Sequence, residues 1–305
     1  MKNILIDTDI GDDIDDALAI RFALNCPEVC VKAITTVYGD TETRAKLVLK
    51  LLRVFDREDI SVGVGIKKSL FGKEDARPIN QAAVLDEKEV LPVLSRHNAV
   101  DLIISKANSC RDLIIVSIGA LTNIATALIK QPHLAKKAKL VMMGGVVNSQ
   151  RAEYNISCDP EAARIVFKSG IEIVMVGLDV TMRCQLRREE LDDLANRGLP
   201  STDLLMDMVK AWQKSSDNTY PVLHDPLAVA VAFDQTLVKM EARKVNVETR
   251  GEFTRGFTIA SKSKISNAQV CLDVDAIRFI DLFMRTTLMS KGICSRNIKA
   301  SYDAL

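Results

Sequence analysis

The sequence predicts an α/β protein built on an open, mostly parallel sheet. Short apolar runs alternate with segments whose apolar residues recur at helical spacing, which is typical of strand–helix–strand units. Strands joined by helical crossovers lie parallel, and helices then cover both faces of the sheet. We therefore expect a Rossmann-like sheet with helices on both faces and extra helices toward the C-terminus.

The first part of the chain shows the clearest alternation. The opening apolar run stops at Asp7 and is followed by a helical pattern around Leu18. The second run is rich in β-branched residues, which favour strands. The expected strands are residues 2–6, 31–38, 60–64, 113–118, 140–143 and 171–176, and the expected helices are residues 15–24, 43–54, 122–129 and 160–168.

Beyond Thr181 the pattern is more helical. No linker rich in Pro, Gly or Ser and no internal repeat divides the chain. We therefore expect one domain over residues 1–305, with the later helices as an appendage. The expected later elements are helices at 188–196, 203–214, 226–233 and 273–288 and strand-like stretches at 242–247 and 257–259.

The charge balance argues against a nucleic-acid partner. Lys and Arg number 41 against 40 Asp and Glu, and a net charge of +1 supplies no basic field for a phosphate backbone. No apolar run reaches the roughly 18 residues that a membrane helix needs. Asp7 interrupts the N-terminal apolar run before a signal-peptide core develops. These features predict a cytoplasmic protein with no membrane partner.

The 7 cysteines form no CxxC pair, and their number is odd. In a chain of this size they are expected to be reduced, mostly buried thiols. A catalytic thiol has no local signature here. The residues are Cys26, Cys30, Cys110, Cys158, Cys184, Cys271 and Cys294.

Six aspartates fall within residues 7–16, between the first expected strand and the first expected helix. Carboxylates packed so closely repel each other, and a hard divalent cation such as Ca²⁺ or Mg²⁺ would relieve the repulsion. Gly11 gives the turn freedom to fold round an ion. Helix capping explains one or two acids at a helix start, but not this number. The spacing is not that of an EF-hand, so the cluster predicts a different metal site.

Other polar or glycine-containing segments also follow expected strands. Gly39-Asp40, Gly119 and Gly144-Gly145 each come directly after an apolar run, as the aspartates do. Ligands of open parallel sheets bind beyond the carboxyl ends of the strands. The sequence therefore predicts a functional site at that edge of the sheet.

With these residues in view, the sequence resembles the nucleoside hydrolases, also called inosine-uridine preferring nucleoside N-ribohydrolases. Residues 7–19 are similar to the family's DxDPGxDDA signature, with Ile10 in place of the proline and two additional residues before Asp15. The resemblance runs in the family's order from residue 3 to about residue 233. Its other segments are IGALTNIA at 118–125, MGG at 143–145, AEYNI at 152–156, DPEAA at 159–163, LDVT at 178–181 and HDPLA at 224–228.

The resemblance implies a Ca²⁺-dependent enzyme that hydrolyses the N-glycosidic bond of ribonucleosides to ribose and free base. It implies that the carboxylates of Asp9, Asp16 and Asp225 and the main-chain carbonyl of Ile118 bind the metal. Asp9 is also expected to deprotonate the attacking water, which the ion makes more acidic. The transition state is expected to resemble an oxocarbenium ion.

The same resemblance implies the residues that hold the ribose. Asp40 stands where many family members carry asparagine, and an acid can still accept a hydrogen bond from a hydroxyl. Asp7 is expected to be a structural acid behind the site, and the resemblance implies a homodimer or homotetramer. The expected ribose contacts are Asp15, Asp40, Asn148, Glu153 and Asn155.

His224 directly precedes Asp225, and we expect it to protonate the departing base. His97 and His133 lack such a setting and are expected at the surface or at helix caps. The preferred base is not predicted, because residues 65–72 carry no histidine where the family often has one. Two aromatic residues, Trp212 and Tyr220, fit a stacking role and a core role equally well.

Other functions fit part of the pattern. A haloacid-dehalogenase-like Mg²⁺ phosphohydrolase also carries a DxD motif after its first strand, but it usually has Thr where this chain has Gly11. A non-catalytic nucleoside-binding or ribose-binding protein would share most of the binding residues. The presence of Asp9, His224 and Asp225 favours catalysis. A dinucleotide oxidoreductase is disfavoured because no GxGxxG follows a strand.

Overall fold

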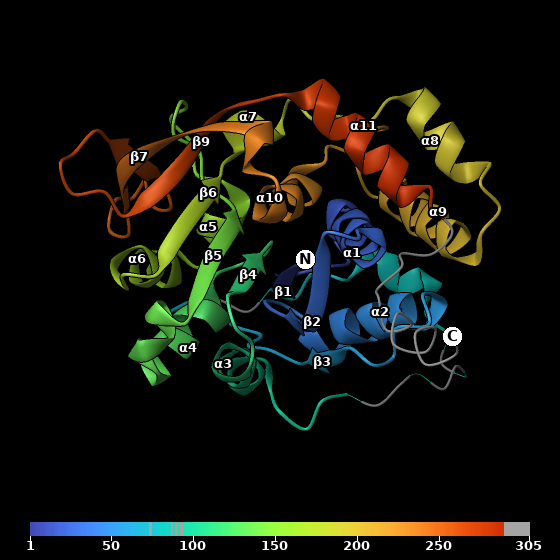
Figure 1. Cartoon of the computed structure of the whole chain (residues 1–305), viewed down its shortest axis with the longest axis horizontal. Coiled ribbons are helices and arrows are strands. Elements are labelled where there is room, and N and C mark those ends of the chain that lie inside the picture. The colour runs from blue at the N-terminus through green and yellow to red at the C-terminus, as the bar shows by residue number, and fades with distance from the viewer. Residues whose placement is uncertain (73–74, 87, 89–90, 92–93, 290–305) are drawn as a thin grey trace, which may run out of the picture.

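The computed structural model describes residues 1–72, 75–86, 88, 91 and 94–289 (Figure 1). A nine-stranded sheet with the order β3-β2-β1-β4-β5-β6-β9-β7-β8 runs through the molecule. Strands β1 to β6 pair with one another only in parallel, and β9 is parallel to β6. Strand β7 is antiparallel to β8 and β9. The predicted open, mostly parallel sheet is confirmed.

The bounds of the elements follow the sequence pattern closely through the first six strands. The strands are β1 Lys2–Thr8, β2 Val29–Thr36, β3 Ser61–Gly63, β4 Leu113–Ser117, β5 Ala138–Met143, β6 Glu172–Val176, β7 Val238–Val247, β8 Thr258–Ser261 and β9 Ala268–Val274. The α-helices are α1 Asp15–Asn25, α2 Thr41–Val54, α3 Ala99–Ser109, α4 Thr122–Lys130, α5 Tyr154–Cys158, α6 Pro160–Lys168, α7 Leu178–Thr181, α8 Arg188–Ala195, α9 Pro200–Gln213, α10 His224–Phe233 and α11 Ala276–Thr287. Short 3₁₀ helices are η1 Asn80–Val84, η2 Pro132–Lys136 and η3 Gln235–Leu237.

Several elements go beyond the sequence prediction. Strand β9 was not expected, and the last helix begins only after it, at Ala276 instead of residue 273. Helices α5 and α7 span a single turn or little more, so they are too short to show a helical period. The side chain of Glu153 caps the start of α5, which is a local interaction that periodicity does not reveal.

Alternate side chains of the sheet pack into two hydrophobic clusters, one on each face. Ile4 and Ile6 of β1 join the cluster formed with α1, α2, α9, α10 and α11. Leu5, between them, joins the cluster formed with α3, α4 and α6. Figure 1 shows α1 and α10 on one side of the strands and α4 and α6 on the other. Burial on both faces explains why the strands read as apolar runs.

The strand order also fixes where a ligand can bind. Strand β1 lies between β2 and β4, and the chain moves outward from β1 toward β3 before it crosses back to β4. In open α/β sheets, ligands bind beyond the carboxyl ends of the strands at such a reversal. The aspartates after β1 therefore lie at the position that the topology favours.

The cysteines agree with the expectation of reduced thiols. The cysteines within the described residues are all free, and Cys26, Cys184 and Cys271 are buried. Cys30, Cys110 and Cys158 are partly exposed, and Cys294 lies outside the described residues. Among the described helices, none has both the length and the apolar character needed to cross a membrane.

Candidate active site

A cavity of about 300 Å³ opens beyond the carboxyl ends of the central strands. Acids from the loop after β1 and the start of α1 line it, together with residues after β4 and β5 and the first residues of α10. Segments far apart in the sequence thus meet at the predicted edge of the sheet. The predicted site residues in the lining are Asp9, Asp15, Asp16, Ile118, Glu153, Asn155, His224 and Asp225.

Three buried carboxylates lie close together in the lining of this cavity. Oxygen atoms of Asp15, Asp16 and Asp225 all lie within 4.8 Å of one another. Burial raises the pKa of each carboxyl well above its usual range, and repulsion from neighbouring acids raises it further. The main-chain N–H of Asp225 donates to Asp15 Oδ2 at 3.3 Å. A donor set made only of carboxylate oxygens suits a hard divalent cation.

Asp9 lines the same cavity but does not belong to this closest trio. It is 6% exposed, and burial raises the pKa of its carboxyl to about 7. The nearby Arg44 guanidinium opposes that shift, while Asp12 and Glu153 add to it. Asp9 is therefore a buried acid in a position to accept a proton from a molecule in the cavity.

Glu153 is held by the backbone that surrounds it. Its carboxylate accepts hydrogen bonds from the main-chain N–H groups of Gly145 at 2.9 Å, Asn155 at 2.8 Å and Ile156 at 3.0 Å. Burial raises the pKa of Glu153, and these N–H groups oppose the shift. Gly145 has a φ of +78°, and this left-handed turn suits glycine. The three bonds fix the carboxylate at one edge of the cavity.

Asn155 links the ends of the neighbouring strands β4 and β5 at the cavity. Its Nδ2 donates to the carbonyl of Ile118 at 3.3 Å, after β4, and to the carbonyl of Met143 at 3.2 Å, at the end of β5. The carbonyl of Ile118, a predicted metal ligand, is therefore oriented by Asn155. A carbonyl oxygen has two lone pairs, so this bond leaves room for an ion.

His224 has a defined partner that the sequence did not reveal. Its Nδ1 lies 2.6 Å from Thr181 Oγ1, at the end of α7. Burial lowers the pKa of His224 to about 4, and the charge of Arg151 contributes. The imidazole is then neutral at pH 7 and carries one N–H. When Thr181 donates to Nδ1, that proton lies on Nε2.

The structure does not bring Asp40 and Asn148 into the cavity lining. The Asp40 carboxylate caps α2, accepting from the main-chain N–H of Thr43 at 3.2 Å and from its hydroxyl at 2.7 Å. Asn148 is exposed, and its main-chain N–H donates to Asp179 Oδ1 at 2.9 Å. Their ribose contacts therefore stay predictions. For Asp40, the free N–H groups of a helix start supply the competing partner.

The two aromatic residues and the two other histidines of the sequence prediction lie outside the cavity lining. Trp212 is 5% exposed and belongs to the hydrophobic core, and Tyr220 packs against that core. Neither residue lines the cavity, so the core role accounts for both. His97 and His133 are exposed, as expected for residues outside the site.

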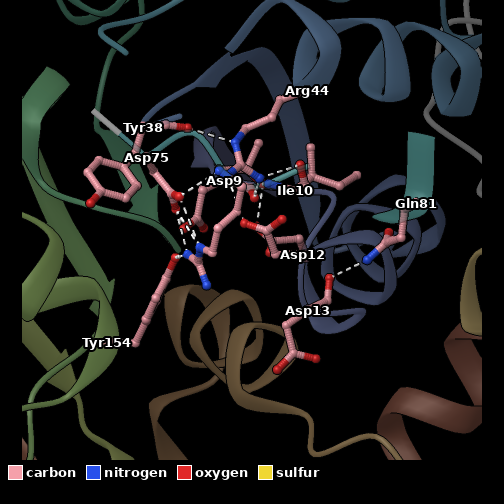
Figure 2. Close-up of polar contacts among 12 residues, drawn as sticks. Asp9, Ile10, Asp12, Asp13, Tyr38, Arg44, Asp75, Gln81 and Tyr154 are labelled. Carbon is pink, nitrogen blue, oxygen red and sulfur yellow. Dashed lines mark hydrogen bonds and ion pairs between the residues drawn. The ribbon is translucent and has the colours of Figure 1, made fainter. Parts of the chain in front are cut away.

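Some residues that line the cavity had no role in the sequence prediction, and two of them have polar side chains that can reach a ligand. Arg151 and Tyr154 both line the cavity. The Tyr154 hydroxyl accepts a hydrogen bond from Arg77, whose Nε donates to Asp75 Oδ1 at 2.9 Å (Figure 2). Arg77 and Asp75 come from the long segment between β3 and η1, near the place where the expected histidine is missing. Asp75, Arg77 and Arg151 belong to no motif, and Tyr154 stands in the AEYNI segment without an expected role, so the tertiary structure was needed to place them at the cavity.

The fold and the site together define an α/β protein with a buried carboxylate centre suited to a metal ion. The chain belongs to the family described as inosine-uridine preferring nucleoside hydrolase, whose model matches residues 4–281. The chain is accordingly an N-glycosyl hydrolase, a nucleoside ribohydrolase.

Known relatives cover nearly the whole chain. A pyrimidine-specific ribonucleoside hydrolase, RihA, of Escherichia coli O9:H4 is 37% identical over 300 residues, covering 92% of this chain and 96% of the relative. The purine-preferring ribonucleoside hydrolase from Gardnerella vaginalis has a TM-score of 0.83 at 32% identity, covering 94% of this chain and 98% of the other. A plant nucleoside hydrolase has a TM-score of 0.82 at 30% identity, covering 94% and 99%. These matches exclude the phosphohydrolase alternative and disfavour a non-catalytic role.

Proposed function

We propose that this nucleoside hydrolase splits the N-glycosidic bond of ribonucleosides with a water molecule that Asp9 activates beside a bound Ca²⁺. The observation that carries the proposal is the group of buried carboxylates Asp15, Asp16 and Asp225, which shares one cavity with Asp9. So many acids would be strongly repulsive without a cation.

The residues present fit a calcium ion. The proposed ligands are the carboxylates of Asp9, Asp16 and Asp225 and the carbonyl of Ile118, all in the cavity lining. Ca²⁺ takes about 6–8 oxygen ligands, so hydroxyls and water can complete the shell. When bound, the ion makes a coordinated water more acidic. Asp15 belongs to the trio with Asp16 and Asp225 and Asp9 does not, so Ca²⁺ titration of Asp9→Ala and Asp15→Ala tests which carboxylate is a ligand.

The ribose and the leaving base use the remaining residues. Asp15, Glu153 and Asn155 are the proposed ribose contacts inside the cavity, and Asp40 and Asn148 keep that role only as predictions. Asp9 accepts the proton of the attacking water. His224 donates a hydrogen bond from its ring N–H to the departing base, or a proton when the imidazole is in its cationic form. The base leaves far more readily as a neutral molecule. The surrounding carboxylates stabilise the positive charge that develops on the ribose in the transition state.

Relatives of this chain differ in the base that their names give. One relative is named pyrimidine-specific and a structural neighbour purine-preferring. Arg151 and Tyr154, which line the cavity, are the candidate contacts for the base.

The same proposal includes properties of the whole protein. They are a single domain over residues 1–305, a cytoplasmic location, a homodimer or homotetramer, and a role in purine or pyrimidine salvage. Limited proteolysis, cell fractionation, sedimentation and growth on nucleosides test these points.

A ribose-release assay tests the reaction. The substrates are inosine, uridine, adenosine, cytidine and p-nitrophenyl riboside, each with added Ca²⁺ and with chelator. Free ribose that appears only with Ca²⁺ supports the proposal. Restoration by Mg²⁺ alone would contradict calcium as the ion, and phosphate release from phosphomonoesters without riboside cleavage would contradict the reaction.

A further inference from the structure

The loop after β1 is held in place by side chains from outside the proposed reaction centre. Its two additional residues relative to the family signature fall in the stretch that contains Asp12 and Asp13. The Asp13 carbonyl accepts a hydrogen bond from Gln81 Nε2 at 2.5 Å, and the Gly11 carbonyl accepts one from the main-chain N–H of Gln81 at 3.1 Å. Figure 2 shows Gln81 reaching this loop from η1. One side of the loop is thus anchored to η1.

Arg44 of α2 anchors the other side of the same loop. Its Nη1 donates to the carbonyls of Asp9 and Ile10, the latter at 2.8 Å, and its Nη2 pairs with Asp12 Oδ2 at 2.9 Å. Its Nε donates to the carbonyl of Tyr38 at 2.7 Å, in the loop after β2. Figure 2 shows these contacts converging on one guanidinium. A planar fork of donors suits such a junction, whereas a lysine ammonium does not reproduce it.

The surrounding backbone closes tightly on this guanidinium. Arg44 is 1% exposed, so its charge is stable there only because carbonyls and a carboxylate receive its N–H groups. Gly39 has a φ of +69°, and a Cβ atom on it would lie 3.2 Å from Arg44 Nη2. A Cβ on Gly11, with φ at +126°, would lie 2.3 Å from Ile79 Cγ2 and 3.7 Å from Arg44 Nη1. The space around the Arg44 guanidinium is therefore narrow, and side chains larger than glycine do not fit at Gly11 and Gly39 without a shift of the neighbouring atoms.

We propose that Arg44 is a positioning residue that fixes the main chain of Asp9, so that the Asp9 carboxylate faces the metal and the water. Asp12 is then the anchor of Arg44 and not a metal ligand, although it also lines the cavity. The inference rests on the proposed function of Asp9 and assigns a role to the two additional residues of the loop. It also explains why the positively charged Arg44 is buried beside a site that is proposed to bind a metal cation.

Charge and position predict opposite results for cation binding. A guanidinium near the site repels a divalent ion, so its removal by Arg44→Met strengthens metal binding if charge is its only effect. If Arg44 positions Asp9, the same change weakens metal binding. The conservative Arg44→Lys keeps the charge but loses the fork, so positioning predicts that it fails nearly as badly.

The experiment measures Ca²⁺ affinity by isothermal titration calorimetry, together with kcat and KM for the best riboside. We expect both Arg44 variants to bind Ca²⁺ about 10–100-fold more weakly and to lose a similar factor in kcat. KM should change by less than about threefold, because two of the proposed ribose contacts, Glu153 and Asn155, lie on another segment. Arg53→Met is the matched control, since Arg53 is also on α2 and pairs at the surface with Glu58 at 3.3 Å. It should match the unmodified enzyme.

Tighter Ca²⁺ binding with unchanged kcat in Arg44→Met, or full rescue by Arg44→Lys, would overturn the inference. If the Arg44 variants do not fold, as judged by circular dichroism, Asp12→Ala decides. It removes one anchor and leaves the carbonyl contacts of Arg44, so positioning predicts a partial loss of both affinity and kcat. Unchanged values in Asp12→Ala would then contradict the inference. If the unmodified enzyme released no ribose, the proposed function would fail separately.

Discussion

Gly119 lies so close to Asp9 that a Cβ atom on Gly119 would be 2.7 Å from Asp9 Oδ1 and 2.9 Å from its Cγ. A contact under about 3 Å forces one of the two groups to move. Gly119 directly follows Ile118 at the end of β4, so the backbone of one strand sets the position of an acid that follows another. The carboxylate of Asp9, the proposed general base, is therefore confined by Gly119 on the β4 side, and its main chain is held by Arg44 on the α2 side.

The first prediction concerns Gly119→Ala. The added methyl group should push the Asp9 carboxylate away from the cavity, and a displacement of about 1 Å can cost on the order of 10²-fold in rate. Steady-state kinetics with p-nitrophenyl riboside measures kcat. The control is Gly170→Ala, where φ is +82° and no atom lies within 4 Å of the new Cβ. It should cost about 1–2 kcal/mol of stability and leave kcat unchanged. An unimpaired Gly119→Ala enzyme would argue against a fixed Asp9 carboxylate.

The second prediction concerns Asp9 itself. Asp9→Ala should lower kcat by about 10²–10⁴-fold, because a general base typically contributes that factor. Calorimetry should still detect a bound cation, since Asp16 and Asp225 are unchanged. Near-normal turnover would refute Asp9 as the base. The matched Asp12→Asn variant should retain most of its activity, because an amide oxygen can still accept from Arg44.

The third prediction separates leaving-group assistance from structure. His224→Ala should reduce turnover of inosine or uridine far more than turnover of p-nitrophenyl riboside, because p-nitrophenolate departs without a proton. Thr181→Val removes the partner of His224 Nδ1, at 2.6 Å, and should give the same selective loss in milder form. Parallel kcat/KM measurements on the two substrate types check this. Equal losses on both types would show that His224 has no role in protonating the base.

The fourth prediction links the cation to folding. A ligand that binds only the folded state at 100 times its Kd adds about 2.7 kcal/mol of stability. Thermal unfolding followed by circular dichroism should therefore show a higher Tm in saturating Ca²⁺ than in chelator. Asp16→Ala should abolish most of this difference, while Asp40→Ala should keep it, because Asp40 caps α2 outside the cavity. A Ca²⁺ effect of equal size in Asp16→Ala would place the ion elsewhere.

Local patterns in the sequence were sufficient for much of this description. Apolar runs and helical periods predict the parallel sheet because burial on both faces demands apolar strands. The aspartates of residues 7–16 predict a cation because carboxylates so close in sequence also lie close in space and repel each other, however the rest of the chain folds. The HDPLA segment also marks the pair His224 and Asp225. These signals depend on neighbours in sequence, which is why they can be read without coordinates.

The contacts between distant segments could only come from the tertiary structure. The resemblance implies a ribose contact at Asp40, which stays a prediction. In the structure the main-chain N–H and the hydroxyl of Thr43, at the start of α2, donate to its carboxylate. Arg44 has no sequence signal, yet folding places its guanidinium against the carbonyls of Asp9, Ile10 and Tyr38. Hydrogen bonds to main-chain carbonyls leave no mark on residue identity, since every residue has a carbonyl. The order of apolar and acidic residues is enough to predict the sheet and the metal site, and the resemblance to the family adds the class of chemistry. The way in which Asp9 is held depends on how α2 and β4 pack against the first loop, which local sequence does not encode.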